Sequence, residues 1–244
     1  MIAIQTINLE KKYKTKIAVS SLNLSVEQGE IFALLGVNGA GKTTTIRMLS
    51  CLCKPTSGDA ILLGESIVTN SQAVKQNINI SPQETAVAPN LTVKENLELI
   101  AGIYGSNKKA ARGKAQEAIS TFSLTEVEND RSKTLSGGMQ RRLSIAMALI
   151  SNPQILFLDE PTLGLDVIAR RELWSTIEKL KRKVTIILTT HYMEEAQALS
   201  DRIGIMAKGE LKAVGTAQEL ISKTGTKTFE DAFISLATET EVKL

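Results

Sequence analysis

Residues 36–44 read Gly-Val-Asn-Gly-Ala-Gly-Lys-Thr-Thr, and this stretch constrains the fold more tightly than any other. Its spacing matches the phosphate-binding pattern G-x-x-x-x-G-K-[ST]. The apolar run at 31–35 before it predicts a buried strand, and residues 45–49 after it predict a helix. The glycines let successive N–H groups converge on phosphate oxygens at the positive end of that helix. The segment therefore predicts a bound nucleoside triphosphate.

Two side chains of this phosphate loop have the chemistry that phosphoryl transfer needs. We expect the ammonium of Lys42 to reach the β- and γ-phosphates, and the hydroxyl of Thr43 to ligate Mg²⁺. Lys42 is therefore a candidate catalytic residue as well as a binding residue. The residues expected to contact the nucleotide here are Gly36, Asn38, Gly39, Ala40, Gly41, Lys42, Thr43 and Thr44.

The composition is that of an ordinary folded domain. Of the 244 residues, 43% are hydrophobic and 23% are charged, which suits one large domain or one core with an insertion. A net charge of +3, without any run of five like charges, disfavours a nucleic-acid-binding protein. Two cysteines and one histidine argue against a disulfide framework and leave too few soft ligands for a zinc site.

Hydropathy gives an expectation for location. The first residues lack a basic segment followed by a long apolar stretch, and no apolar run reaches the length of a membrane span. We therefore expect a cytoplasmic protein without a signal peptide or membrane-spanning helix.

The pattern of hydrophobic residues divides the chain into regions of different secondary structure. Short β-rich runs at 2–9, 17–26 and 59–64 predict a small antiparallel sheet. From about residue 83 to 150 the pattern is helical, which predicts a helical subdomain inserted into the nucleotide-binding core. The combination indicates an α/β fold.

Two long apolar runs, at 155–158 and 184–188, predict strands of a mainly parallel sheet covered on both faces. Ligands of such α/β sheets bind beyond the carboxyl ends of the strands. Asp159 and Glu160 directly follow the first run. Asp159 is thus a candidate ligand of Mg²⁺, and Glu160 is the candidate base that orients water and accepts its proton.

Two further polar residues occupy comparable positions. His191 ends the run that starts at Val184, which makes it a candidate contact of the γ-phosphate. Gln83 follows the short strand candidate 78–82, and its amide is suited to bridge Mg²⁺ or the attacking water. We therefore count Gln83 and His191 as candidate catalytic residues, with Gln83 also a candidate metal ligand.

A second glycine-rich motif, Leu135-Ser136-Gly137-Gly138-Met139-Gln140, predicts another anion-binding helix terminus. Ser136 is expected to cap a helix that continues to Leu149, with the glycines exposing backbone N–H groups at its start. A capped helix without a ligand is the alternative explanation of such a pattern.

With this motif the chain resembles the ATP-binding cassette (ABC) ATPases, over essentially residues 2–215. The resemblance implies a P-loop NTPase core of ABC type with an antiparallel β subdomain and the inserted helical subdomain. It also implies that Tyr13 stacks on adenine and that 164–166 form the family's D-loop. The expected organisation is an ABC ATPase domain at 1–220 and a C-terminal helical tail at 221–244.

The resemblance further implies a head-to-tail dimer in which ATP lies between the phosphate loop of one cassette and Ser136 and Gly138 of the other. One phosphate loop and one such motif per chain support this independently, since complete sites then require two cassettes. The resemblance also implies that ATP binding closes the dimer and that hydrolysis reopens it.

The sequence around 83–97 and 189–196 resembles bacterial export-type cassettes that work with separate permease chains. This implies a protein held at the cytoplasmic face of the cell membrane by its permease. Two alternatives stay open: a soluble ABC ATPase that acts on ribosomes or DNA, and a regulatory switch that binds ATP without efficient turnover.

Overall fold

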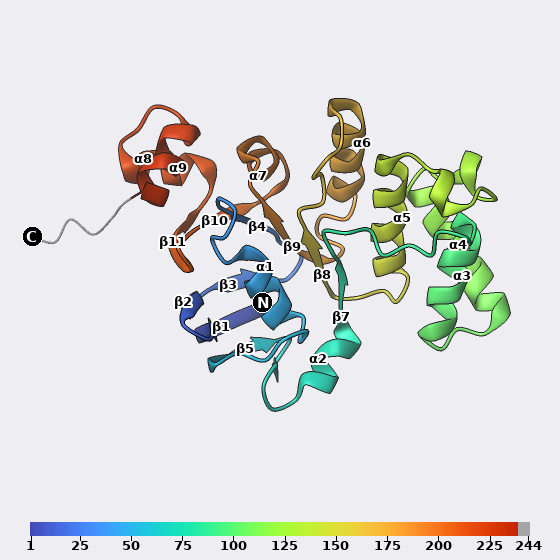
Figure 1. Ribbon diagram of the computed structural model, residues 1–244, viewed down its shortest axis with the longest axis horizontal. Coiled ribbons are helices and arrows are strands. Elements are labelled where there is room, and N and C mark those ends of the chain that lie inside the picture. The colour runs from blue at the N-terminus through green and yellow to red at the C-terminus, as the bar shows by residue number, and fades with distance from the viewer. Residues whose placement is uncertain (239–244) are drawn as a thin grey trace, which may run out of the picture. The chain divides into compact units, whose positions relative to one another are not determined.

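The computed structural model describes residues 1–238, and Figure 1 traces their secondary structure. The chain divides into two units, each described here by itself. The first unit comprises Met1–Gln76 together with Lys181–Leu244, and the second unit comprises Asn77–Leu180.

The domain boundaries expected from the sequence stay predictions. These were a domain at 1–220, an insertion at about 83–150 and a tail at 221–244. Within that tail, residues 239–244 lie outside the described residues.

The first unit contains the antiparallel sheet that the β-rich runs predicted, in the strand order β2-β1-β5-β6 with β3 also paired to β1. Its strands are β1 (Ile2–Tyr13), β2 (Lys16–Leu22), β3 (Ser25–Glu27), β5 (Ser57–Leu62) and β6 (Glu65–Ser66). The run at 17–26 forms two strands instead of one, because β2 ends at Leu22 and residues 23–24 belong to neither strand before β3 begins at Ser25. Likewise β5 ends at Leu62, since Leu63 and Gly64 form a turn with positive φ.

A second sheet of the first unit leads to the phosphate loop. Its strands are β4 (Ile31–Leu35), β9 (Thr185–Thr190), β10 (Arg202–Ala207) and β11 (Glu210–Gly215). Strand β4 pairs in parallel with β9 on one side and with β10 on the other, and β11 closes the edge as an antiparallel neighbour of β10. Every residue of β4 and β9 is buried, as predicted for strands of a covered parallel sheet.

The helices that follow these strands are short. They are α1 (Lys42–Leu49), α2 (Ser71–Asn77), α7 (Met193–Leu199), α8 (Ala217–Thr224) and α9 (Phe229–Thr238). Helix α9 packs against α8 and against the hairpin of β10 and β11. Its buried residues are Phe229, Ala232 and Leu236, at the spacing of one helix face.

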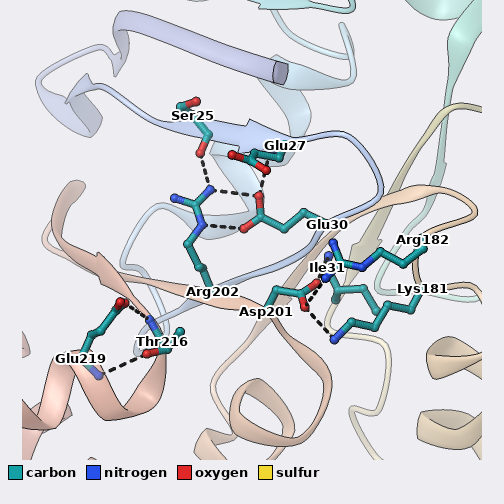
Figure 2. Close-up of polar contacts among 10 residues, drawn as sticks. All are labelled: Ser25, Glu27, Glu30, Ile31, Lys181, Arg182, Asp201, Arg202, Thr216 and Glu219. Carbon is teal, nitrogen blue, oxygen red and sulfur yellow. Dashed lines mark hydrogen bonds and ion pairs between the residues drawn. The ribbon is translucent and has the colours of Figure 1, made fainter. Parts of the chain in front are cut away.

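A partly buried ion pair joins Glu30, directly before β4, to Arg202 at the start of β10 (Figure 2). Arg202 binds both carboxylate oxygens of Glu30, with Nε 2.7 Å from Oε1 and Nη2 2.9 Å from Oε2. Glu30 is only 4% exposed, and it also accepts the backbone N–H of Glu27 at 2.7 Å. The buried carboxylate is thus paired and hydrogen-bonded, the condition under which a buried charge is tolerated.

Asp201, beside this pair, ties β4 to the loop before β9 (Figure 2). Its Oδ2 accepts the backbone N–H of Ile31 at 3.0 Å, and its Oδ1 lies 2.7 Å from the Lys181 ammonium and 3.5 Å from the Arg182 guanidinium. Burial by itself would raise the pKa of this carboxyl, but the bonds from Lys181 and Ile31 and the two positive charges lower it.

The second unit combines a pair of parallel strands with helices. The strands are β7 (Ile78–Ser81) and β8 (Ile155–Asp159). Its helices are α3 (Val93–Ile103), α4 (Lys108–Thr121), α5 (Gly137–Leu149) and α6 (Val167–Glu178), with 3₁₀ turns η1 (Thr125–Val127) and η2 (Ser132–Thr134).

The start of α3 confirms the predicted capping box. Thr92 Oγ1 accepts the backbone N–H of Glu95 at 3.1 Å, and Glu95 Oε2 accepts that of Thr92 at 2.8 Å. Among the helices of residues 1–238, none is long and apolar enough to cross a membrane.

Candidate functional site

The phosphate loop folds as its glycines require. Gly39 and Gly41 have φ values of 81° and 105°, a region that residues with a Cβ rarely occupy. The Lys42 side chain is 4% exposed, and its Nζ donates to the carbonyls of Gly36 at 2.7 Å and Val37 at 3.3 Å. The ammonium is therefore held against the loop backbone, on the concave side that a phosphate would occupy in such loops.

Neighbouring strands hold this loop in place. The backbone N–H of Gly209, in the turn between β10 and β11, donates to the carbonyl of Ala40 at 3.0 Å. A Cβ on Gly41 would lie 2.5 Å from the carbonyl oxygen of Ala18, and a Cβ on Gly36 would collide with the carbonyl of Met206. Two of the glycines are thus required by close packing as well as by the turn.

The helix that follows the loop starts without a side-chain cap. Gly41 is the N-cap of α1 and has no side chain with which to bond the first amides. Asn38 and Thr43 are exposed, Thr44 is half-buried and Ala40 is buried. Backbone amides at a helix start, next to a buried ammonium, form the kind of site that fits a phosphate group.

Two of the predicted contacts outside the loop lie beside it in the first unit. His191 directly follows β9, whose last residue pairs with Leu35 at the end of β4. Tyr13 ends β1, and its hydroxyl interacts with the side chains of Cys53 and Thr44. Partial burial and the neighbouring Cys53 raise the pKa of the Tyr13 hydroxyl. The Tyr13 ring is 45% exposed, as a stacking surface for a base would have to be.

In the second unit, the predicted catalytic carboxylates and Gln83 lie beyond two neighbouring strand ends. Ser81 of β7 pairs with Leu158 of β8, so Gln83 and Asp159 leave the sheet on the same edge. Asp159 is the last residue of β8 and is 4% exposed, whereas Gln83 is exposed. Oxygen atoms of an amide, a carboxylate and a hydroxyl are the donors that Mg²⁺ prefers, so Gln83, Asp159 and Thr43 suit the metal chemically.

Glu160 has an unusual backbone. Its φ is 46°, and the residue is only 9% exposed. A non-glycine residue held in this region stores conformational strain, which is common where a side chain must be aimed at a reacting group. Nine other described non-glycine residues also have a positive φ, so this conformation alone does not assign Glu160 a task.

The glycine-rich motif at 135–140 caps α5 as predicted. Ser136 is the N-cap, and its Oγ accepts the backbone N–H of Met139 at 3.3 Å. Ser136 and Gly137 are exposed. A Cβ on Gly138 would lie 2.9 Å from the Cβ of Ala169 in α6, so this glycine is needed for helix packing whatever else it contacts.

Each unit thus brings together one part of the predicted set. The first unit gathers the phosphate loop, Tyr13 and His191, and the second gathers Gln83, Asp159, Glu160 and the motif at Ser136. Sequence reasoning missed Arg141, which is 3% exposed and donates to backbone carbonyls beside Gln83 and Asp159. In the sequence it is only one of two adjacent arginines on a predicted helix, and no signal distinguishes them.

Comparisons with known proteins show the family of the chain. The sequence model of a family described as ABC transporter matches residues 19–163. The chain is 41% identical over 233 residues to the Linearmycin resistance ATP-binding protein LnrL of Bacillus subtilis (strain 168), covering 95% of this chain and 75% of LnrL. It is 43% identical over 212 residues to the Phospholipid-transporting ATPase ABCA3 of Homo sapiens, but this covers 87% of the chain and only 12% of ABCA3.

A solved structure has the same architecture. It is the dimeric, post-hydrolysis state of the ATP-binding cassette MJ0796 bound to ADP and Pi, with a TM-score of 0.79 and 28% sequence identity. The match covers 87% of this chain and 98% of that one. The fold predicted from the sequence, a P-loop core with parallel strands, an antiparallel β part and added helices, is therefore confirmed.

Proposed function

This chain is an ATP-binding and ATP-hydrolysing member of the ABC transporter family, and from that premise we propose that it drives export through a separate membrane permease. The observation that carries the nucleotide-binding part of the proposal is the phosphate loop, with its buried Lys42 ammonium held against the carbonyls of Gly36 and Val37. Bound phosphates would give the ammonium stronger acceptors than these carbonyls, because hydrogen bonds between charged groups are stronger than those to neutral acceptors. The export part is supported by the similarity to a resistance ATP-binding protein.

Binding of the nucleotide is the task proposed for the first unit. Lys42 would turn its ammonium from the loop carbonyls to the β- and γ-phosphates, while the amides of the loop and of the α1 start surround the same oxygens. Tyr13 would stack on the adenine. Magnesium, when bound through Thr43, Gln83 and Asp159, would neutralise charge on the phosphates.

Hydrolysis is the task proposed for the strand-end side chains. The Glu160 carboxylate would orient the attacking water and accept its proton, and Gln83 would donate to or accept from that water. His191 would donate to the γ-phosphate as negative charge shifts on its oxygens. These roles are expected from the resemblance and from residue chemistry, and each can be tested by substitution.

A dimer completes this proposal. Ser136 and Gly137 are exposed at the start of α5, where the helix amides point outward. We infer that in the dimer Ser136 and Gly138 of one copy contact the ATP bound to the phosphate loop of the other. The dimer would close when ATP binds and open after hydrolysis, because ATP binds more tightly to the closed dimer than to the open one. This change would move the permease.

Export and a peripheral position at the cytoplasmic face of the membrane are supported by the relatives. LnrL is by name a resistance protein, and ABCA3 is by name a transporting ATPase. The alternatives, a soluble ATPase acting on ribosomes or DNA and a switch without turnover, are less well supported. The switch also leaves Glu160, the candidate base, without a task.

Affinity purification from membranes and from ribosomes tests the transporter assignment. We expect the chain to bring down a multi-span membrane protein, and its ATPase rate to rise when that protein is present. Association with ribosomes alone would favour the first alternative. ATP binding with no phosphate release, even in the presence of the membrane partner, would favour the switch.

A further inference from the structure

The guanidinium of Arg141 lies inside the second unit and donates to backbone carbonyls of two different loops. Its Nε donates to the carbonyl of Pro161 at 2.9 Å, and its Nη2 to that of Asp159 at 2.8 Å. Its Nη1 donates to the carbonyl of Pro82, and to that of Gln83 at 3.3 Å. The acceptors are the last residue of β8 and residues of the loops that follow β7 and β8.

The helix that carries Arg141 is itself fixed to β7. One turn further along α5, Ser144 shares a hydrogen bond with Ser81, the last residue of β7, at 3.0 Å between the two hydroxyl oxygens. Both hydroxyls are buried. Residues three apart on a helix share a face, so Arg141 and Ser144 hold the same side of α5 against the strand end.

The same helix begins at the motif that we propose contacts the partner's ATP. Ser136 is its N-cap, five positions before Arg141. The helix therefore connects that exposed terminus to the backbone from which Gln83 and Glu160 project. A rigid element with contacts at both ends can carry a displacement from one to the other.

We propose that Arg141 is a positioning residue for ATP hydrolysis, whose guanidinium keeps the Gln83 and Asp159–Glu160 loops in register with helix α5. The inference rests on the proposed function, because it assigns Arg141 a task in the turnover of ATP. Arg141 itself would not touch the nucleotide. It would set the positions of Gln83, Asp159 and Glu160, which act on the attacking water and on Mg²⁺.

The chemistry of arginine suits this task. Its planar fork offers five N–H donors in fixed directions, so it can hold carbonyls of two loops at a fixed separation. Lysine offers one ammonium on a flexible stem and can satisfy only part of the set. Since hydrolysis requires water, base and phosphate to be aligned within a fraction of an ångström, a small shift of either loop slows the reaction strongly.

Two substitutions of the full-length chain, Arg141→Met and Arg141→Lys, test the proposal against Arg142→Met. Arg142 is the matched control, because it occupies the next position of α5 and its guanidinium pairs with the side chain of Glu172 at 3.3 Å rather than with the two loops. For each variant, kcat, KM and nucleotide affinity are measured together with amide hydrogen exchange.

We expect Arg141→Met to lower kcat by about 100-fold while nucleotide affinity changes by less than about 3-fold. Arg141→Lys should recover part of kcat. Amide exchange at residues 82–84 and 159–163 should accelerate in both Arg141 variants and stay unchanged in Arg142→Met.

Three results would overturn the proposal. The first is an unchanged kcat in both Arg141 variants. The second is a loss of kcat in Arg141→Met that is no larger than in Arg142→Met, or that is matched by an equal loss of nucleotide affinity. The third is unchanged exchange of the two loops. If Arg141→Met does not fold, Arg141→Lys alone must show the split between kcat and affinity. The exchange readout needs no turnover, so a wild-type chain without ATPase activity would count against the proposed function and not against this inference.

Discussion

The backbone N–H of Gly36 donates to the carbonyl of Thr190 at 3.3 Å, which ties the first residue of the phosphate loop to the residue before His191. Strands β4 and β9 run in parallel with Leu35 opposite Thr190, so both chains leave the sheet at the same level. The position of His191 beside the loop is therefore fixed by strand register. Because the backbone at His191 is already fixed, little backbone conformational entropy is lost when its side chain binds a phosphate.

We expect His191→Ala to lower kcat by about 100-fold, the effect of removing one aligned donor to a developing charge. Nucleotide affinity should change much less, since the loop donors stay in place. Steady-state phosphate release and equilibrium binding of a fluorescent ATP analogue separate the two quantities. Equal losses in both would mean that His191 supports binding and not turnover.

Lys42→Ala should weaken ATP binding by about 10- to 100-fold or more, because hydrogen bonds to a charged group contribute about 1.5–3 kcal/mol each. Titration calorimetry measures the effect directly. Lys54→Ala is the matched control, since Lys54 lies on the surface just beyond the same helix and should leave affinity unchanged. An unaltered affinity in Lys42→Ala would remove this lysine from the site.

The two adjacent glycines of α5 should respond oppositely to alanine in unfolding experiments. A Cβ on Gly137 meets no atom within 4 Å, so Gly137→Ala should stabilise the fold by about 0.5–1 kcal/mol through helix propensity. Gly138→Ala should instead cost about 1–3 kcal/mol, because its Cβ would lie 2.9 Å from that of Ala169. Urea unfolding of both variants checks the sign, and the same sign for both would contradict the packing argument.

Asp201 should make stability depend on acid pH. Its pKa is lowered in the folded state, so its contribution is fully present above the unfolded value of about 3.9 and is lost as the pH falls through the folded value. At pH 7 Asp201→Asn should cost about 2 kcal/mol, and the difference from wild type should shrink at acid pH.

Urea unfolding near pH 7 and pH 3 measures this difference. Glu210→Gln is the control, because the pair of Glu210 with Lys212 is on the surface and should contribute less than about 1 kcal/mol at either pH. A cost of Asp201→Asn that is the same at both pH values would rule out the proposed linkage.

The parts of the fold that depend on local chemistry were predictable from the sequence. Strand β4, the capping box of Thr92 and Glu95, and the Ser136 cap of α5 follow from patterns within a few residues. The break at residues 23–24 between β2 and β3 was missed, because Leu22, Leu24 and Val26 keep the alternating apolar pattern across it. The hairpin of β10 and β11 also escaped prediction, although its turn supports the phosphate loop through Gly209.

The candidate site was predictable only where a side chain touches the nucleotide in the family pattern. Arg141 acts on backbone carbonyls 18 to 59 residues away in sequence, and carbonyls carry no side-chain signature. Its role becomes visible only when β7, β8 and α5 are placed together. The same holds for Gly138, whose packing against Ala169 cannot be separated in the sequence from a role in binding.

The central claim, that two copies share each ATP, is tested most directly in a background that cannot hydrolyse it. Glu160→Gln removes the proposed base and should preserve ATP binding, giving a stable ATP-bound dimer. Adding Lys42→Ala to one preparation and Ser136→Arg to another damages both sites of either homodimer. A mixed dimer, however, retains one site with an intact phosphate loop and an intact partner motif.

Native mass spectrometry of the two preparations, alone and mixed with ATP, gives the answer. We predict dimers in Glu160→Gln itself and ATP-bound mixed dimers in the mixture, with monomers when either doubly substituted chain is alone. Mixed chains that remain monomeric, or a Ser136→Arg chain that dimerises by itself as well as Glu160→Gln does, would contradict the account.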